Sequence, residues 1–223
     1  MQSILNKTTP LFYLILIICT ICFSSSILAN SRNNKTCDII PGRPLTNGYG
    51  PYDFTNSQHS HKLEIVLFAH FTPDVERLKA GASSSRIIAD IDYTLRAIPN
   101  YHRALYAMAR HQRIEKMKMQ ATDYFYSVDC YFKRALYMQP NDAIAHMLYA
   151  MHMHLENRLE LARKEYQIAV KLAPGNPEIR YNAGLLEVKL GNLKEAQKHA
   201  EIAYAANYPL PGLRQQISEM QNN

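Results

Sequence analysis

The fold follows from two consecutive segments of equal length: AIAHMLYAMHMHLENRLELARKEYQIAVKLAPGN at 143–176 and PEIRYNAGLLEVKLGNLKEAQKHAEIAYAANYPL at 177–210. An offset of 34 positions, the difference between 177 and 143, matches small, aromatic and proline residues along this region: Ala150 with Gly184, Ala162 with Ala196, Ala135 with Ala169 and Ala203, Phe132 with Tyr166, and Pro140 with Pro174. Small residues let paired helices approach closely, aromatic residues fill the space to the next pair, and proline ends a helix. This offset, the sequence period, therefore predicts two helices per unit and an all-α fold.

This pattern resembles the tetratricopeptide repeat, a unit of two helices with the same period. Residues 143–176 match the motif most fully. Residues 177–210 are similar to it, except that Ala200 stands where an aromatic residue is usual. An upstream unit over about 102–142 also resembles it, lengthened by the insertion Lys116–Asp123. The resemblance implies a short right-handed solenoid of about three helical hairpins, within a repeat domain at 101–223. A generic helical bundle with accidental spacing is the alternative.

A wider arrangement is similar to a group of exported bacterial tetratricopeptide proteins. Its parts are NGYGPYDF at Asn47–Phe54, HFTPDVERL at His70–Leu78 and DYTLRA at Asp92–Ala97, all before the repeats. This resemblance implies the tetratricopeptide fold and an exported location. It implies no particular biochemical activity.

The N-terminal segment at 1–29 has the features of a secretory signal peptide. Lys7 is followed by an uncharged apolar run over 11–22, and small residues follow up to Ala29. The run is shorter than the roughly 20 apolar residues that span a bilayer, which disfavours a membrane anchor. We expect cleavage after Ala29, with Ser26 as the rival site, and a periplasmic or secreted mature chain without a membrane span.

Two cysteines remain after this cleavage, Cys37 and Cys130. An even number of cysteines in an oxidising compartment predicts a disulfide, and two buried free thiols are the alternative. The bond would attach the region at 30–58, which is rich in Asn, Gly and Pro and predicts irregular structure, to the helical body. Residues 59–100 predict N-terminal helices that pack on the repeats. One is expected to begin at Thr72-Pro73 and end near Gly81, and another to be capped by Ser84 or Ser85.

Composition narrows the classes of function. The chain is 47% hydrophobic with a net charge of +6, so it can bury a core and is not broadly disordered. Most of the excess charge lies in 101–140, which holds seven Lys and Arg against three Asp and Glu. The basic cluster lacks a recognised nucleic-acid module, so no nucleic-acid partner is expected.

The resemblance implies that the first helix of each unit lines a concave groove, the usual binding surface. The groove positions that the resemblance implies give these candidate contacts with a partner: Arg103, Tyr106, Arg110, Arg113, Met147, Met151, His154, Tyr181, Leu185 and Lys189. Ile114 and Leu155 also stand at groove positions. The first four candidates share one helical face by their spacing. An acidic or amphipathic peptide is the expected partner, and a solvated charged face is the alternative interpretation.

Motifs for nucleophilic, phosphate-binding or dinucleotide chemistry are not found in the sequence. The histidines do not give a set with metal-ligand spacing, because His152 and His154 point to different sides of one helix. The sequence thus predicts a non-enzymatic scaffold of the bacterial envelope that binds a protein or peptide, with no cofactor and no metal. The alternative is an envelope enzyme or small-ligand-binding protein whose site lies between the Asn47–Phe54 loop and the first repeat, using Asp53, His70 and Tyr93.

Overall fold

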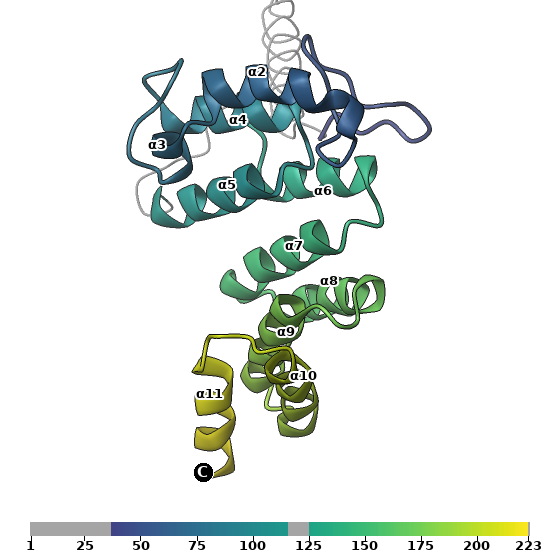
Figure 1. The fold of residues 1–223 in the computed structure, drawn as a ribbon, viewed down its shortest axis with the longest axis vertical. Coiled ribbons are helices and arrows are strands. Elements are labelled where there is room, and N and C mark those ends of the chain that lie inside the picture. The colour runs from purple at the N-terminus through teal and green to yellow at the C-terminus, as the bar shows by residue number, and fades with distance from the viewer. Residues whose placement is uncertain (1–36, 116–124, 223) are drawn as a thin grey trace, which may run out of the picture. The chain divides into compact units, whose positions relative to one another are not determined.

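A computed structural model describes residues 37–115 and 125–222 of the chain (Figure 1). In these two ranges the chain is all-helical and contains no strand, which confirms the expected all-α class. Their elements are η2 (Ser57–His59), a short 3-10 helix, and ten α-helices: α2 (Ser60–His70), α3 (Pro73–Glu76), α4 (Ile87–Ala97), α5 (His102–Glu115), α6 (Val128–Met138), α7 (Ala143–Leu155), α8 (Leu159–Leu172), α9 (Pro177–Lys189), α10 (Leu193–Ala205) and α11 (Gly212–Gln221). None of these helices is long and apolar enough to cross a bilayer. The expected leader at 1–29 lies outside the described residues.

The helices between residues 143 and 205 form two adjacent pairs whose boundaries recur at the sequence period. α7 packs against α8, and α9 packs against α10 (Figure 1). α9 begins one period after α7, and α10 begins one period after α8. Asp142 and Asn176 cap α7 and α9, and each side chain accepts two backbone N–H groups of the first turn. One sequence period therefore corresponds to one pair of helices.

The turn inside each pair also recurs. Asn157 and Gly191 both have left-handed backbone conformations, with φ of 59° and 78°. The amide of the next residue, Arg158 or Asn192, then bonds to a carbonyl near the end of the preceding helix, at 2.9 and 2.8 Å. Such bonds satisfy carbonyls that a helix end leaves without a partner. Asparagine and glycine adopt this conformation most readily, so the two turns have the same backbone with different side chains.

Small residues allow the pairs to pack closely. Ala162 and Ala196, which occupy equivalent positions in α8 and α10, are fully buried. Gly184 in α9 lies under α11, where an added Cβ would stand 2.5 Å from Cδ2 of Leu213. α11 contacts both α9 and α10. The absence of a side chain at Gly184 therefore makes room for the last helix.

The buried residues form two hydrophobic clusters. The larger cluster extends from α2 to α9, and the smaller one joins α9, α10 and α11. Within the larger cluster, Phe132 of α6 stacks on Tyr149 of α7 with ring centroids 4.9 Å apart. α5 contacts both α6 and α7. The expected insertion between α5 and α6 falls on residues 116–124, which lie outside the described residues.

The N-terminal segment is irregular from residue 37 to residue 56, as its composition predicts. Cys37 forms the expected disulfide with Cys130 of α6. The same helix makes two further ties to the segment. Nη1 of Arg134 donates to the Cys37 carbonyl at 3.0 Å, and the Tyr137 hydroxyl contacts two more carbonyls of the segment. The segment is thus held on α6 by one covalent bond and several hydrogen bonds.

Two local predictions for residues 70–100 are corrected by the structure. Thr72 does cap α3, because its hydroxyl accepts the Val75 amide, but the helix ends at Glu76 and not near Gly81. α4 begins at Ile87 after Arg86, and no side chain caps it. The Ser84 amide donates instead to the buried carboxylate of Asp90, at 3.1 Å. The Ser84 hydroxyl accepts the Arg86 amide at 3.1 Å, before the helix begins, so it does not cap α4.

Candidate functional site

The first helices of the pairs follow one another, since α5 contacts α7 and α7 contacts α9. On α5, Tyr106 is 41% exposed, and the guanidinium of Arg110 lies 5.6 Å from its ring centroid. Arg113 is exposed one turn further along. Arg103 is exposed as well, but it forms an ion pair with Glu76. The charge of Arg103 is therefore already compensated within the chain.

Two residues predicted to form the apolar floor of the groove are core residues. Met147 is only 1% exposed and belongs to the larger hydrophobic cluster. Tyr181 is buried in the smaller cluster, where its ring lies 4.6 Å from that of Tyr208. Neither residue offers a surface to a partner. The groove positions implied by the resemblance do not take α11 into account. This helix covers the end of the last pair, which explains the burial of Tyr181.

The remaining predicted residues are accessible. Met151, His154 and Leu185 are half-buried and Lys189 is exposed, while two apolar neighbours at groove positions, Ile114 and Leu155, are 59% and 54% exposed. We name this set the first-helix surface and define it by these residues: Tyr106, Arg110, Arg113, Ile114, Met151, His154, Leu155, Leu185 and Lys189. Burial and the neighbouring Lys189 charge lower the pKa of His154, so its ring is neutral near pH 7. The first-helix surface thus combines cationic, aromatic and exposed apolar groups.

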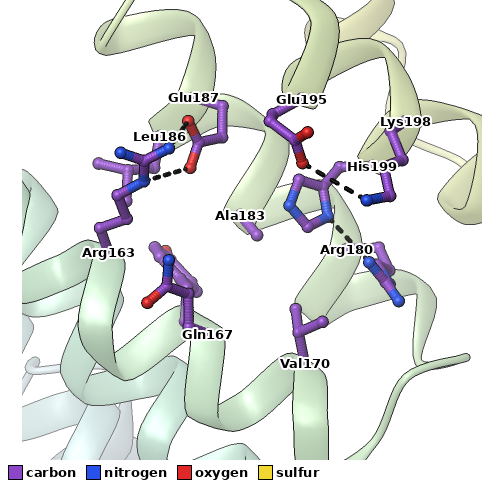
Figure 2. A pocket seen from close by; sticks show the side chains of 11 residues that line it. Arg163, Gln167, Val170, Arg180, Ala183, Leu186, Glu187, Glu195, Lys198 and His199 are labelled. Atoms are coloured by element: carbon purple, nitrogen blue, oxygen red, sulfur yellow. Dashed lines mark hydrogen bonds and ion pairs between the residues drawn. The ribbon is translucent and has the colours of Figure 1, made fainter. Parts of the chain in front are cut away.

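A cleft of about 410 Å³, separate from the first-helix surface, is lined by residues of α8, α9 and α10 (Figure 2). Its lining residues come from these three helices: Arg163, Tyr166, Gln167, Val170, Arg180, Ala183, Leu186, Glu187, Glu195, Lys198 and His199. None of them is among the residues that the sequence predicts to contact a partner. The volume is in the range of small-molecule sites in proteins.

The charges at one end of the cleft compensate one another. Arg163 donates from Nε and Nη2 to the two carboxylate oxygens of Glu187, at 2.9 and 3.1 Å. Asn192, the residue before α10, donates to the same carboxylate at 2.7 Å. Glu187 is buried, so these bonds compensate for the removal of its charge from water. This end of the cleft is therefore satisfied without a ligand.

At the other end Glu195 is paired with Lys198 at 3.7 Å, and Arg180 has no carboxylate partner in the described part of the chain. Arg180 is 9% exposed, and its Nε donates to the Pro174 carbonyl at 2.7 Å. Its Nη1 lies 3.3 Å from Nδ1 of His199. Among the described residues no Asp or Glu forms an ion pair with this guanidinium. Burial lowers the pKa of Arg180, and burial together with the Arg180 charge lowers the pKa of His199.

The equivalent residues of the preceding pair have a different charge balance. His146, one sequence period before Arg180, contacts the Pro140 carbonyl through Nε2 at 3.0 Å. Its Nδ1 lies 2.6 Å from the carboxylate of Glu165, which stands one period before His199. Burial opposes protonation of His146, but Glu165 and the carbonyl outweigh it and raise its pKa. The same position is thus a histidine–carboxylate pair in one unit and an arginine–histidine pair in the next.

Tyr166, from α8, is 2% exposed in the wall of the cleft. Its hydroxyl is buried and has no hydrogen-bond partner among the described residues. Burial raises the pKa of this hydroxyl, so it is protonated near pH 7. A buried phenol without a partner is unfavourable, because burial removes its hydrogen bonds to water.

The alternative site near the N-terminal loop consists of residues that serve the structure. The Asp53 carboxylate accepts hydrogen bonds from Thr55, Asn100 and Gln139, and these bonds lower its pKa although burial opposes them. His70 lies 2.8 Å from the buried carboxylate of Asp90 and stacks on Tyr93 at 3.9 Å. The structure thus brings His70 and Tyr93 together, and Asp53 is engaged in holding the loop against Asn100.

Two further histidines contact neighbouring groups of the protein. His59 contacts the backbone of Asp53, and His152 pairs with Asp129 at 3.5 Å. Within residues 37–115 and 125–222, no group of three or more His, Cys, Asp or Glu side chains is arranged to hold a metal ion. These histidines therefore act in hydrogen bonds and ion pairs of the described fold.

Comparison with known proteins supplies no function for the chain. No protein-family model matches the sequence, and no curated protein is significantly similar to it. The first-helix surface and the cleft are therefore the observations from which a function is inferred.

Proposed function

We propose that the protein is an exported, non-enzymatic scaffold of the tetratricopeptide type that binds an acidic or amphipathic protein or peptide on its first-helix surface. The observation that carries this proposal is the exposed face of α5. There Arg110 stands beside the exposed ring of Tyr106, Arg113 is exposed about one turn further along, and none of the three belongs to the hydrophobic core.

The assignment of repeats is supported by recurrence in three dimensions. Helix boundaries, caps and left-handed turns return at the sequence period between α7 and α10. α11 contacts α9 and α10 in the way that α9 contacts α7 and α8, so it takes the place of a following first helix. We assign repeats at about 102–142, 143–176 and 177–210, with α11 as the terminal helix.

The chemistry of the first-helix surface indicates the class of partner. Arginine and tyrosine are prominent among residues that dominate binding energy at protein interfaces, because both offer a large planar group with hydrogen-bonding capacity. Exposed Ile114 and Leu155 add apolar area beside the cations. A partner with acidic residues next to apolar ones would match both features, and charge complementarity would speed its association.

Export is supported by the disulfide between Cys37 and Cys130. Structural disulfides persist in oxidising compartments and are rare in the cytosol of mesophiles. Together with the signal-like segment at 1–29, this bond favours the periplasm or the cell exterior. The irregular segment at 30–58 and the helices at 59–100 would then support the repeat domain at 101–223.

The proposal is tested by comparing two charge reversals. Arg110→Glu reverses a charge on the first-helix surface, while the control Lys171→Glu reverses an exposed charge at the end of α8. Each variant and the wild type are used for affinity capture from an envelope extract, with circular dichroism to check the helices. We expect the wild type and the control to capture the same protein and Arg110→Glu to lose it. Identical capture by all three proteins would exclude this surface as the binding site.

A further inference from the structure

The cleft between α8 and α10 contains a buried cation without a counter-charge among the described residues. In the preceding pair, His146 has the carboxylate of Glu165 as its partner, 2.6 Å away. In the α9–α10 pair, the cation is Arg180, and the residue at the position of Glu165 is His199. Arg180 thus keeps the bond to the proline carbonyl, while a neutral ring replaces the carboxylate.

A buried charge without a partner is costly, and such charges in proteins are normally paired or neutralised. The Arg180 guanidinium carries five N–H donors in a planar fork. Nε is used by the Pro174 carbonyl and one N–H of Nη1 by His199, which leaves further donors. Arg180 lines the cleft, so a ligand there could reach them.

A second polar group in the wall of the cleft also lacks a partner. The buried hydroxyl of Tyr166 in the cleft wall finds no partner in the part of the chain that the structure describes. A neutral phenol can donate one hydrogen bond and accept others, and a carboxylate oxygen accepts such a bond. The cleft therefore has the Arg180 guanidinium in its lining, with unused donors, and the Tyr166 hydroxyl buried in its wall without a partner among the described residues.

We infer that this cleft binds the carboxylate of a small organic acid or of a peptide C-terminus, and that Arg180 receives it. Figure 2 shows Arg180 and His199 at one side of the cleft and the Arg163–Glu187 pair at the other. The ligand would supply Arg180 with the charge that Glu165 supplies to His146. This site lies on the other side of α9 from the first-helix surface and does not depend on it.

The rest of the lining indicates the body of the ligand. Val170, Ala183 and Leu186 contribute apolar surface, and Glu187 is already paired with Arg163. A short apolar body attached to the carboxylate would fit this combination. A small organic acid and a peptide C-terminus both carry a carboxylate on an apolar body. The probes must therefore vary the carboxylate and the rest of the ligand separately.

The test uses a variant that provides an internal carboxylate. In His199→Glu, the new side chain stands where Glu165 stands in the preceding pair, so it should pair with Arg180 and keep the fold. His199→Gln is the matched control, since it has a neutral side chain there. Both are compared with the wild type, prepared with its disulfide intact from the periplasm of cells that express the complete chain.

The probes are N-acetyl-leucine, its amide, a leucine-terminated tripeptide with a free or amidated C-terminus, and inorganic phosphate. Binding is followed by NMR shifts of the cleft residues. We expect saturable binding of the free acids, loss of binding by about tenfold or more with either amide, and the same loss in His199→Glu, because the charge-assisted bond is absent. His199→Gln, which adds no carboxylate beside Arg180, should keep most of the binding that His199→Glu loses.

The relative affinity of N-acetyl-leucine and the tripeptide acid identifies the source of the carboxylate. Three results would each overturn the inference: equal binding of acids and amides, undiminished binding to a folded His199→Glu variant, or saturation by phosphate alone. The absence of any saturable shift with the free acids would overturn it as well. None of these results bears on the first-helix surface.

Discussion

Nη1 of Arg180 lies 3.3 Å from Nδ1 of His199. These two residues stand one sequence period after His146 and Glu165, which also contact each other, but their contact contains no carboxylate. Arginine can only donate, so Nδ1 of His199 accepts and the ring is neutral. The two contacts therefore respond to pH in opposite directions. Their positions differ by one repeat, which makes each a control for the other.

The stability that depends on His199 should fall as the pH falls. Burial and the Arg180 charge lower its pKa in the folded protein, so the unfolded chain binds more protons at this site. The loss begins as the pH drops through the unfolded value of about 6.5. The change in free energy of unfolding between pH 7.5 and 5.5, measured by urea denaturation, should be smaller in His199→Gln than in the wild type. An equal change in both proteins would contradict the assignment.

The His146–Glu165 pair should show the opposite dependence. Its raised pKa means that the folded protein holds the proton more tightly, so its contribution is complete below about pH 6.5 and is lost as the pH rises through the folded value. We expect Glu165→Gln to lower the free energy of unfolding more at pH 5.5 than at pH 8.5. A larger effect at the higher pH would show that the pair is not an ion pair.

Removal of the disulfide should release the N-terminal segment. The bond closes a loop with a sequence separation of 93 residues. In the chain-entropy model this corresponds to about 4–5 kcal/mol. The double variant Cys37→Ser/Cys130→Ser should lose stability of this order in urea denaturation and become sensitive to proteolysis between residues 37 and 56. Mass spectrometry of the wild type without reductant provides the control, and two free thiols there would remove the basis of the prediction.

Gly184→Ala should disturb α11. The added Cβ would lie 2.5 Å from Cδ2 of Leu213, which is fully buried. Such overpacking costs about 1–3 kcal/mol, measurable by urea denaturation. Gly175→Ala is the matched control, because nothing lies within 4 Å of a Cβ there. Equal stability of both variants would mean that α11 does not rest against Gly184.

The period of the sequence was sufficient to predict the helical pairs between residues 143 and 205. Small residues such as Ala162 and Ala196 mark close helix packing, and the structure buries both. The disulfide was predictable from the cysteine count and from the expected leader. These features depend on local spacing or on composition, which a single sequence contains.

Other features depend on tertiary contacts that spacing does not reveal. Tyr181 stands at a groove position but is covered because α11 packs on its helix. Ser84 has the chemistry of a helix cap, yet its amide binds Asp90 and its hydroxyl accepts the Arg86 amide before α4 begins. The sequence does contain a sign of the cleft. The alignment that matches Ala162 with Ala196 also matches Glu165 with His199. That change of charge between equivalent positions of successive helical pairs was the available signal.

The proposed contact between the face of α5 and a partner can be tested at a single residue in living cells. The photoreactive residue p-benzoylphenylalanine is placed either at Tyr106 or at Phe68 for crosslinking. Phe68 is an 88% exposed aromatic residue on α2, so it controls for exposure alone. We predict a discrete crosslinked product from position 106 that Arg110→Glu abolishes, and none from position 68. Products from position 68 alone, or no product from position 106, would contradict the proposed role of α5.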